Sequence, residues 1–335
     1  MNDDLGIRGL LADYHSGARA PAAVLRAAHA RAEESDQPVW ITLLDWDVVA
    51  EYLARLGDPG PDRPLYGVPF AIKDNIDLAG ALTTAGCPAF GYLPERSAFV
   101  VDRLIAAGAI PLGKANMDQF ATGLVGTRTP YGACRSVIDG RYIAGGSSSG
   151  SAVAVAAGMV SFALGTDTAG SGRVPAAFNG IVGLKPSLGL LSTRGAVPAC
   201  RTLDCVSIFT RDAADAGLVL AAAAAPDPAD PYSRPARARP GRPLPLRIGI
   251  PRPGQLDFFG DAGAAGAWER ARAHAEALGL RLVETDLAPY LEAARLLYHG
   301  AWVAERTAAV GEFVARHPDE VDPVVGPIIA GGARP

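Results

Sequence analysis

The sequence predicts an α/β fold in which a central mixed, largely parallel β-sheet is covered by helices on both faces. Short apolar runs alternate with helical patterns between residues 66 and 210, and loops rich in glycine and serine separate them. Apolar residues make up 49% of the 335-residue chain, which suffices for a large core. Strands that alternate with helices are typical of a sheet with mainly parallel strands.

The N-terminal part predicts two helices and a strand. Residues 5–15 and 21–34 carry apolar side chains at helical spacing, and Pro21 suits a first helical turn. Residues 39–44 have the pattern of a short strand. The elements expected next are strands at 67–72, 109–112, 160–164 and 181–184, and helices at 99–107 and 151–157.

The C-terminal part predicts a β-α-β unit after a proline-rich segment. Residues 226–245 hold seven prolines, and we expect a linker or surface excursion within a single domain that spans residues 1–335. Strands at 246–250 and 280–284, with a helix at 262–278 between them, predict a continuation of the same sheet. A long helix over residues 289–314 follows.

Composition excludes several classes of function. The net charge is −4 without a basic stripe, so we expect no nucleic-acid partner. No apolar run approaches the ~20 residues of a membrane span, and the N-terminus lacks the pattern of a signal peptide. We therefore expect a cytoplasmic protein with reduced thiols, no membrane contact, no metal and no cofactor. The cysteines lack metal-ligand spacing: Cys87, Cys134, Cys200 and Cys205.

Lysine is rare in this chain. Of 31 basic residues only Lys73, Lys114 and Lys185 are lysines, which leaves 28 arginines. Arginine keeps its proton in proteins, whereas a buried lysine can lose it. Lys73 ends an apolar strand, where a crowded polar pocket would favour the neutral amine that a general base needs. The alternatives are a solvated strand-end charge at Lys73 and a loop charge at Lys185.

The segment 144–172 is the densest unusual stretch. It contains two runs of small residues, at 145–151 and 165–172. Small residues let a substrate approach the backbone closely, and N–H groups in such loops can hold a developing oxyanion. A serine nucleophile needs a base, and no histidine occurs between His29 and His274, so Lys73 is the local candidate.

Other interpretations of this segment stay open. Residues 146–150 match the GxSxG elbow, which would make Ser148 the nucleophile with a distant histidine as base, either His274, His299 or His317. The same residues also fit a flexible loop with an N-cap for a helix near Ser151. A phosphate cradle is disfavoured, because the lysine of the GxxxxGK[ST] pattern is absent.

Three separated motifs resemble the amidase signature family. They are Gly-Val-Pro-Phe-Ala-Ile-Lys-Asp-Asn at 67–75, Gly-Gly-Ser-Ser-Ser-Gly-Ser at 145–151 and Gly-Thr-Asp-Thr-Ala-Gly-Ser-Gly-Arg at 165–173. Lys73 precedes Ser147 by 74 residues, and Ser147 precedes Ser171 by 24, which fits the family. The resemblance implies the amidase-signature fold and a Ser–Ser–Lys triad.

In that triad the resemblance makes Ser171 the nucleophile and Lys73 the base. Ser147 is the bridging serine, on a cis peptide bond after Gly146. Lys73 takes a proton through Ser147, Ser171 attacks the amide carbonyl, and the relay returns a proton to the leaving ammonia. The resemblance also implies an oxyanion hole made by the backbone N–H groups of Thr168, Ala169, Gly170 and Ser171.

Segments 115–128, 185–205 and 297–306 resemble the allophanate hydrolase branch of the family. This implies that Tyr298 and Arg306 hold a substrate carboxylate and that Gly123 lines the opposite side. Tyr298 and Arg306 lie eight residues apart on the predicted helix, roughly two turns, so both can face one pocket. An arginine fork suits a carboxylate. The alternative is a core tyrosine and an arginine paired with Glu305.

The leading functional hypothesis is hydrolysis of allophanate with release of ammonia, in urea degradation. The expected partners are this small-molecule substrate, a second copy of the chain in a homodimer, and a functional link to urea carboxylase. A broad-specificity amidase, or the amidase subunit of an amidotransferase, is the second hypothesis. Family domains extend further than this chain, so we expect the C-terminal part to be missing. The third hypothesis is an inactive truncated fragment.

Overall fold

The computed structural model describes residues 5–236 and 246–332. The chain divides into two compact units. The first comprises Met1–Ala236 and Trp302–Pro335, and the second comprises Arg237–Ala301. The three motifs that resemble the amidase signature, at 67–75, 145–151 and 165–173, all lie in the first unit.

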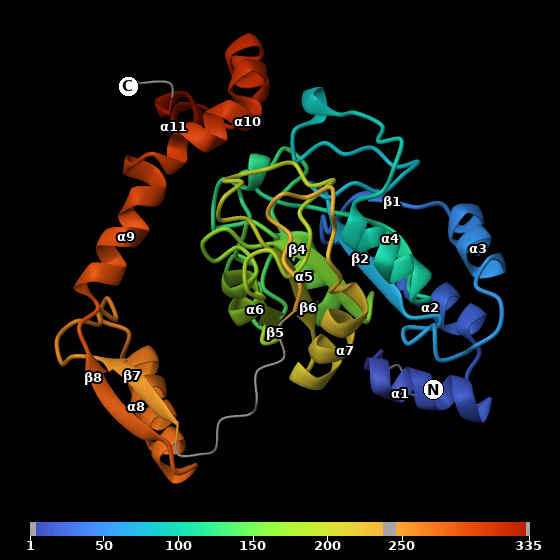
Figure 1. Ribbon diagram of the computed structural model, residues 1–335, viewed down its shortest axis with the longest axis horizontal. Coiled ribbons are helices and arrows are strands. Elements are labelled where there is room, and N and C mark those ends of the chain that lie inside the picture. The colour runs from blue at the N-terminus through green and yellow to red at the C-terminus, as the bar shows by residue number, and fades with distance from the viewer. Residues whose placement is uncertain (1–4, 237–245, 333–335) are drawn as a thin grey trace. The chain divides into compact units, whose positions relative to one another are not determined.

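The first unit is built on a six-stranded sheet with the order β1-β3-β2-β4-β6-β5 (Figure 1). β2 pairs in parallel with β3 and with β4, whereas β1 against β3, β4 against β6 and β5 against β6 are antiparallel. The bounds are β1 Trp40–Leu43, β2 Pro69–Lys73, β3 Ile110–Ala115, β4 Phe162–Thr166, β5 Val182–Leu184 and β6 Val206–Thr210.

The mixed sheet confirms the prediction, but parallel pairing is limited to the three central strands. The prediction of a largely parallel sheet was therefore too strong. The reason is the connection from β5 to β6, which is a long loop rather than a crossover helix and returns the chain antiparallel. β6 itself was not predicted, since its apolar run directly follows a polar turn.

Helices cover the sheet on both faces. α5 (Ser149–Ala156) packs against β2, β3, β4 and β6, and α7 (Ala213–Ala223) packs against β5, β6 and α4 (Phe99–Ala106). Every residue of β2, β3, β4 and β6 is buried, so alternate side chains on both faces are covered. The other helices here are α1 Ile7–Ser16, α2 Pro21–Glu33, α3 Trp46–Ala54 and α6 Arg173–Phe178.

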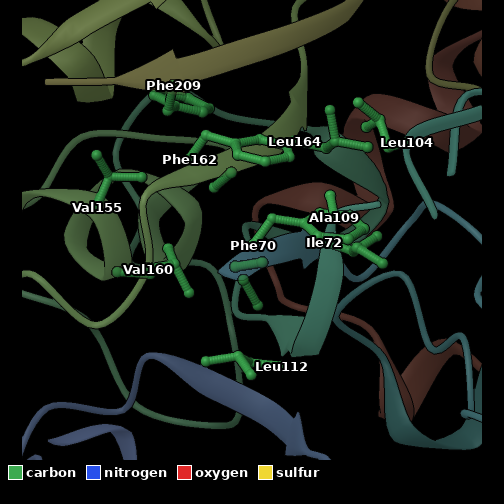
Figure 2. Close-up of a cluster of buried hydrophobic side chains, with 14 of the residues drawn as sticks. Phe70, Ile72, Leu104, Ala109, Leu112, Val155, Val160, Phe162, Leu164 and Phe209 are labelled. Carbon is green, nitrogen blue, oxygen red and sulfur yellow. The ribbon is translucent and has the colours of Figure 1, made fainter. Parts of the chain in front are cut away.

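Aromatic stacking joins the two central strands. The rings of Phe70 in β2 and Phe162 in β4 are stacked at 5.0 Å between centroids and 5° between planes (Figure 2). Both side chains are fully buried, together with Ile72, Leu164 and Phe209. Burial of each such side chain contributes about 1.5–3 kcal/mol, so this cluster holds β2 and β4 in register.

The C-terminal part of the first unit is helical. α10 (Trp302–Arg316), a 3-10 turn at Pro318–Glu320 and α11 (Val325–Gly331) form it. Four residues of α10 are buried at spacings of three and four, which defines one inward face. They are Val303, Arg306, Val310 and Val314. Arg306 therefore lies on the buried face of this helix.

The second unit contains the predicted β-α-β motif. β7 (Arg247–Pro251) and β8 (Arg281–Thr285) are parallel, and α8 (Ala262–Ala277) connects them. They form a two-stranded sheet of their own, so the prediction that they continue the main sheet was wrong. Apolar periodicity within a strand predicts the strand but does not reveal which other strands it pairs with.

The predicted helix over 289–314 is interrupted. α9 (Ala288–His299) ends at Gly300, whose backbone is extended with φ −129°, and α10 begins at Trp302. Glycine ends helices readily because it lacks a Cβ and has low helix propensity. Tyr298 and Arg306 thus lie on different helices and in different units, which corrects the prediction that they share one helix.

The first half of the proline-rich segment is anchored to the first unit. The Asp227 and Asp230 carboxylates are buried, and Ser192 Oγ lies 2.8 Å from Asp227 Oδ2 and 2.9 Å from Asp230 Oδ2. Asp227 also accepts from Arg194 Nε at 2.7 Å. Residues 237–245 of the predicted linker lie outside the described residues.

None of the helices within residues 5–236 and 246–332 is both long and apolar enough to cross a membrane. Within the same residues, no cluster of histidine, cysteine and acidic side chains could hold a metal ion. All four cysteines are buried and free.

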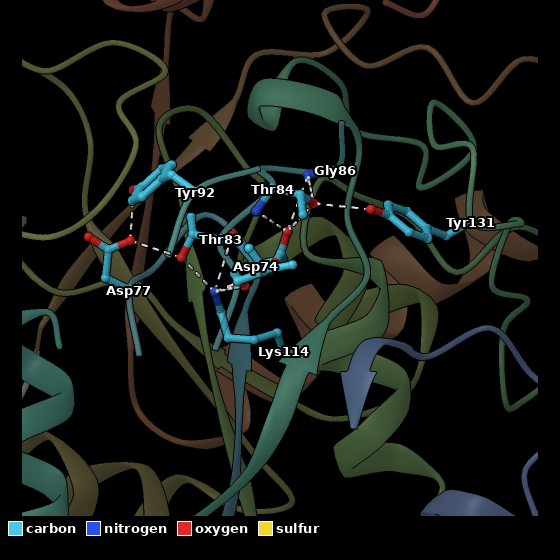
Figure 3. Close-up of polar contacts among 9 residues, drawn as sticks. Asp74, Asp77, Thr83, Thr84, Gly86, Tyr92, Lys114 and Tyr131 are labelled. Carbon is cyan, nitrogen blue, oxygen red and sulfur yellow. Dashed lines mark hydrogen bonds and ion pairs between the residues drawn. The ribbon is translucent and has the colours of Figure 1, made fainter. Parts of the chain in front are cut away.

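A buried ion pair stabilises the loop that follows β2 (Figure 3). Lys114 Nζ in β3 lies 3.2 Å from Asp74 Oδ1, and both side chains are fully buried. Lys114 also donates to Thr83 Oγ1 at 2.9 Å, and Asp74 Oδ2 accepts from the backbone N–H of Thr84 at 2.9 Å. Desolvation lowers the pKa of Lys114, and Asp74 opposes that effect. Since Asp74 follows Lys73 directly, this pair also fixes the end of β2.

We expect Lys114→Met to lower the free energy of unfolding by about 3–5 kcal/mol, because the Asp74 carboxylate would stay buried without its cation. Urea denaturation measures the change. The matched control is Arg55→Met, which breaks an exposed pair with Glu51 and should cost less than about 1 kcal/mol. Equal losses in the two variants would contradict a special role for the buried pair.

Candidate functional site

Lys73 lies at the end of β2, where its amine meets two hydroxyl groups. Nζ lies 2.7 Å from Ser147 Oγ and 2.8 Å from Thr166 Oγ1, and the lysine side chain is fully buried. Thr166 ends β4, which runs parallel to β2. Because parallel strands present their carboxyl ends at one edge of a sheet, Lys73 and Thr166 emerge side by side. The structure thus brings together two predicted triad members, Lys73 and Ser147.

The environment of Lys73 favours its neutral form. Desolvation lowers its pKa to about 7, and the carboxylates of Asp118, Asp204 and Asp167 oppose the shift from a distance. Within the described residues Lys73 has no ion-pair partner. An amine with a pKa near neutrality can accept a proton under physiological conditions, as a general base must.

The backbone at Gly146 and Ser147 is fixed by hydrogen bonds and by close packing against Asp118 and Gly126. The Gly146–Ser147 peptide bond is cis, as the resemblance implied. The Ser147 carbonyl accepts from the backbone N–H of Asp118 at 3.0 Å, and the Asp118 carboxylate accepts from the N–H of Gly126 at 3.0 Å. A Cβ at Gly146 would collide with the Asp118 carboxylate and with the Gly126 nitrogen. Only glycine therefore fits before Ser147.

Ser171 lies in a loop between β4 and α6, and backbone N–H groups of this loop donate to the carboxylate of Asp167. Asp167 is fully buried and accepts from the N–H groups of Gly170 at 2.7 Å and Gly172 at 3.1 Å, and from Arg173 Nε at 2.9 Å. Burial alone would raise the pKa of Asp167, but these hydrogen bonds and the Arg173 charge lower it overall. Asp167 is therefore a fixed anion, and the loop keeps one shape.

The four predicted oxyanion donors are not equivalent. The Gly170 N–H already donates to Asp167. In the described part of the chain, the backbone N–H groups of Thr168, Ala169 and Ser171 have no hydrogen-bond acceptor. Gly170 has φ +136°, a conformation that favours glycine and turns the peptide so that its N–H points to Asp167. Three of the four predicted donors thus remain available.

A short path of contacts connects Ser171 to Arg306. Ser171 Oγ lies 3.4 Å from the carbonyl oxygen of Gly123 and is nearly buried. The preceding residue, Thr122, accepts a hydrogen bond at Oγ1 from Arg306 Nη1 at 2.8 Å. Arg306 is only 2% exposed, so its guanidinium lies inside the protein beside the Gly123 loop. The backbone of Tyr298 lies in α9, but its side chain lies outside the described residues.

Two residues of the site were missed by sequence reasoning. Thr166 contacts Lys73, and Asn75 Nδ2 donates to Thr166 Oγ1 at 3.2 Å and to the Val197 carbonyl at 3.2 Å. Both residues lie inside the motifs: Thr166 precedes Ser171 by five residues, and Asn75 follows Lys73 by two. Their position in the motifs was the available signal.

The alternative interpretations find little support. The Ser148 hydroxyl is buried and donates to the Thr166 carbonyl at 3.3 Å, and no hydrogen bond joins it to a described histidine side chain. His317 stacks on Phe313, and His274 lies in α8 of the second unit. The His299 side chain lies outside the described residues. Lys185 donates to the Pro186 carbonyl at 3.0 Å and is a loop charge.

Comparison with known proteins agrees with this geometry. The Amidase family model matches residues 23–326. The urea amidolyase of Lachancea kluyveri is 47% identical over 299 residues, which cover 88% of this chain and 16% of that protein. A glutamyl-tRNA(Gln) amidotransferase chain of Symbiobacterium thermophilum is 42% identical over 260 residues, 75% of this chain and 52% of that one.

Among solved structures, the S177A allophanate hydrolase of Kluyveromyces lactis aligns with a TM-score of 0.91 and 42% identity. The alignment covers 98% of this chain and 54% of that one. The chain thus spans about a sixth of the urea amidolyase and about half of the allophanate hydrolase chain. From the family match and these identities, the chain belongs to the amidase family, whose members are hydrolases of amide C–N bonds.

Proposed function

We propose that this chain hydrolyses allophanate, with release of ammonia, through a triad of Ser171, Ser147 and Lys73. The observation that carries the proposal is the fully buried Lys73 amine, 2.7 Å from Ser147 Oγ and with a pKa of about 7. A buried neutral amine is a general base, and a serine hydroxyl next to it can pass a proton on.

We infer the following reaction from the proposed roles of Lys73, Ser147 and Ser171. Lys73 accepts the Ser147 proton, and Ser147 in turn accepts the proton of Ser171, whose Oγ attacks the amide carbonyl. The N–H groups of Thr168, Ala169 and Ser171 stabilise the oxyanion. As the C–N bond breaks, the relay returns the proton to the leaving nitrogen, and ammonia departs. Water then attacks the acyl-enzyme by the same relay, and the carboxylate product leaves.

The substrate class rests on Arg306 and on the relatives. Allophanate carries a carboxylate beside its amide, and a buried guanidinium is the group that recognises such an anion through paired hydrogen bonds. Arg306 is buried and donates to Thr122, and the carbonyl oxygen of the next residue, Gly123, lies 3.4 Å from Ser171 Oγ. The similarity to a urea amidolyase and to an allophanate hydrolase supports the same substrate.

The similarity to urea amidolyase supports a functional link to urea carboxylase, and we also propose a cytoplasmic location and a homodimer. The alternative is a broad amidase or the amidase component of an amidotransferase, which the 42% identity to the amidotransferase chain favours. A broad amidase acting on neutral amides does not need a cation for a substrate carboxylate, so the role of Arg306 separates that candidate from allophanate hydrolysis.

We expect Ser171→Ala to reduce ammonia release from allophanate by at least about 10³-fold, because the nucleophile is lost. Ammonia is measured by a coupled assay on the purified chain, with malonamate and a neutral carboxamide in parallel. Ser148→Ala is the matched control and should retain most of the activity, since the hydrogen bond of the Ser148 hydroxyl goes to the backbone carbonyl of Thr166. A parent chain inert on all three compounds would overturn the proposal, and an inactive Ser148→Ala variant with an active Ser171→Ala variant would restore the GxSxG interpretation.

We expect kcat/KM to rise with pH and to reach half its maximum near pH 7. The pKa of Lys73 is lowered to about 7, so the amine is protonated and inactive below that pH and neutral above it. Rates measured from about pH 5 to about pH 9 test this. Lys73→Arg keeps a permanent charge and should be inactive throughout the range. A flat profile for the parent chain would exclude Lys73 as the base.

We expect Arg306→Met to raise KM for allophanate about tenfold or more, because charge-assisted hydrogen bonds of about 1.5–3 kcal/mol would be lost. Hydrolysis of a neutral carboxamide should change little. Arg316→Met in the same helix is the control, since Arg316 is 64% exposed at its side chain and forms an exposed ion pair with Glu312. Thermal unfolding of each variant verifies the fold. An equal loss on both substrates would favour a structural role for Arg306.

A further inference from the structure

One turn, residues 199–205, contacts both the loop of the nucleophile and the helix of Arg306. On one side, the Asp204 carboxylate accepts a hydrogen bond from Thr168 Oγ1 at 2.5 Å. The same carboxylate accepts from the backbone N–H groups of Ala199 at 2.9 Å and Cys200 at 3.1 Å. All three partners donate, so both carboxylate oxygens of Asp204 accept hydrogen bonds.

On its other side the turn is bound by α10. Glu305 accepts from the backbone N–H of Thr202 at 2.9 Å and from Thr202 Oγ1 at 2.7 Å. Glu305 directly precedes Arg306. The turn therefore connects the substrate-binding helix of the proposed function to the proposed oxyanion loop through two carboxylates.

Thr168 is the first of the three available oxyanion donors. Asp167 holds the far part of the loop, through Gly170, Gly172 and Arg173, but makes no side-chain contact with Thr168. The side chain of Thr168 has one hydrogen-bond acceptor among the described residues, Asp204. The orientation of the Thr168 peptide thus depends on a residue that lies 36 positions further along the chain.

We propose that Asp204 is a positioning residue for catalysis: through Thr168 Oγ1 it aims the first backbone donor at the oxyanion, and through the Thr202–Glu305 contact it keeps Arg306 at a fixed position relative to that donor. The inference rests on the proposed function. Asp204 does not touch the reacting atoms. Substrate recognition and oxyanion stabilisation are set by the same turn.

The test uses Thr168→Val, which removes the donor to Asp204 and keeps the size and the β-branch of the side chain. The readout is the rate at which phenylmethylsulfonyl fluoride modifies Ser171, followed by mass spectrometry. In this step the Ser171 Oγ–S bond forms, the S–F bond breaks, fluoride leaves and the Ser171 proton passes through Ser147 to Lys73. The reagent carries no substrate carboxylate, so the rate does not depend on Arg306.

We expect Thr168→Val to slow this modification about tenfold or more, and to lower kcat for allophanate with KM changed less than about threefold. Thr168→Ser, which restores the hydroxyl, should recover most of the loss. Asp204→Asn should slow the modification at least as much, because it weakens the Thr168 contact and the backbone contacts of the turn, and the double variant should be no slower than Asp204→Asn, since the Thr168 contact is already disturbed in that variant. Thr285→Val in β8 is the control for the substitution itself.

An unchanged modification rate in Thr168→Val would overturn the inference, whatever happens to its thermal stability. Losses in Thr168→Val and Asp204→Asn that add in the double variant would also overturn it, since they would show independent roles. If Ser171 of the parent chain is not modified at all, the proposed nucleophile is wrong, and this inference falls with it. The two failures are thus distinguishable.

Discussion

The site depends on one constraint, which is an amine buried at the end of a central strand without a counter-ion. β2 is buried over its whole length, so Lys73, its last residue, has no route to solvent. Its amine is satisfied by the hydroxyls of Ser147 and Thr166, at 2.7 and 2.8 Å. The hydroxyl groups satisfy the hydrogen-bonding capacity of the amine but do not neutralise a positive charge on it. Desolvation therefore dominates and lowers the pKa of Lys73 to about 7.

The second buried lysine shows what a counter-ion changes. Lys114 lies in the neighbouring strand and is as buried as Lys73, but it has the Asp74 carboxylate at 3.2 Å. That carboxylate opposes the desolvation, so Lys114 acts as half of a structural ion pair. Of the acids that act on Lys73 from a distance, Asp118 and Asp167 are turned toward backbone N–H groups instead. These two carboxylates thus stabilise loops by accepting backbone hydrogen bonds, and the pKa of the Lys73 amine stays low.

The sequence predicted the parts of this site that are local in the chain. Lys73, Ser147 and Ser171 stand in motifs with characteristic spacing, and the central strands stand out as apolar runs. What it could not predict depends on contacts between distant segments. The bond from Thr168 to Asp204 joins residues 36 apart, and the separate sheet of β7 and β8 depends on which strands pair. Periodicity within one element carries no information about either.

The helix break at Gly300 shows a different kind of limit. Apolar spacing continues on both sides of the glycine, so the pattern favoured one helix from Pro289 to Val314, and a single extended residue ended it.

The part of the pattern that falls in α10 nevertheless predicted its buried face correctly. Val303, Val310 and Val314 form an inward stripe, and Arg306 stands in line with them. A guanidinium on the apolar face of an amphipathic helix is costly unless it meets a partner, which here includes Thr122 beside the Gly123 loop. The position of that arginine is thus set by hydrophobic packing of α10, whereas the position of Lys73 is set by the end of a strand. In the proposed function, substrate recognition and proton transfer therefore depend on two separate parts of the fold, and the turn at 199–205 contacts both the helix of Arg306 and the proposed oxyanion loop.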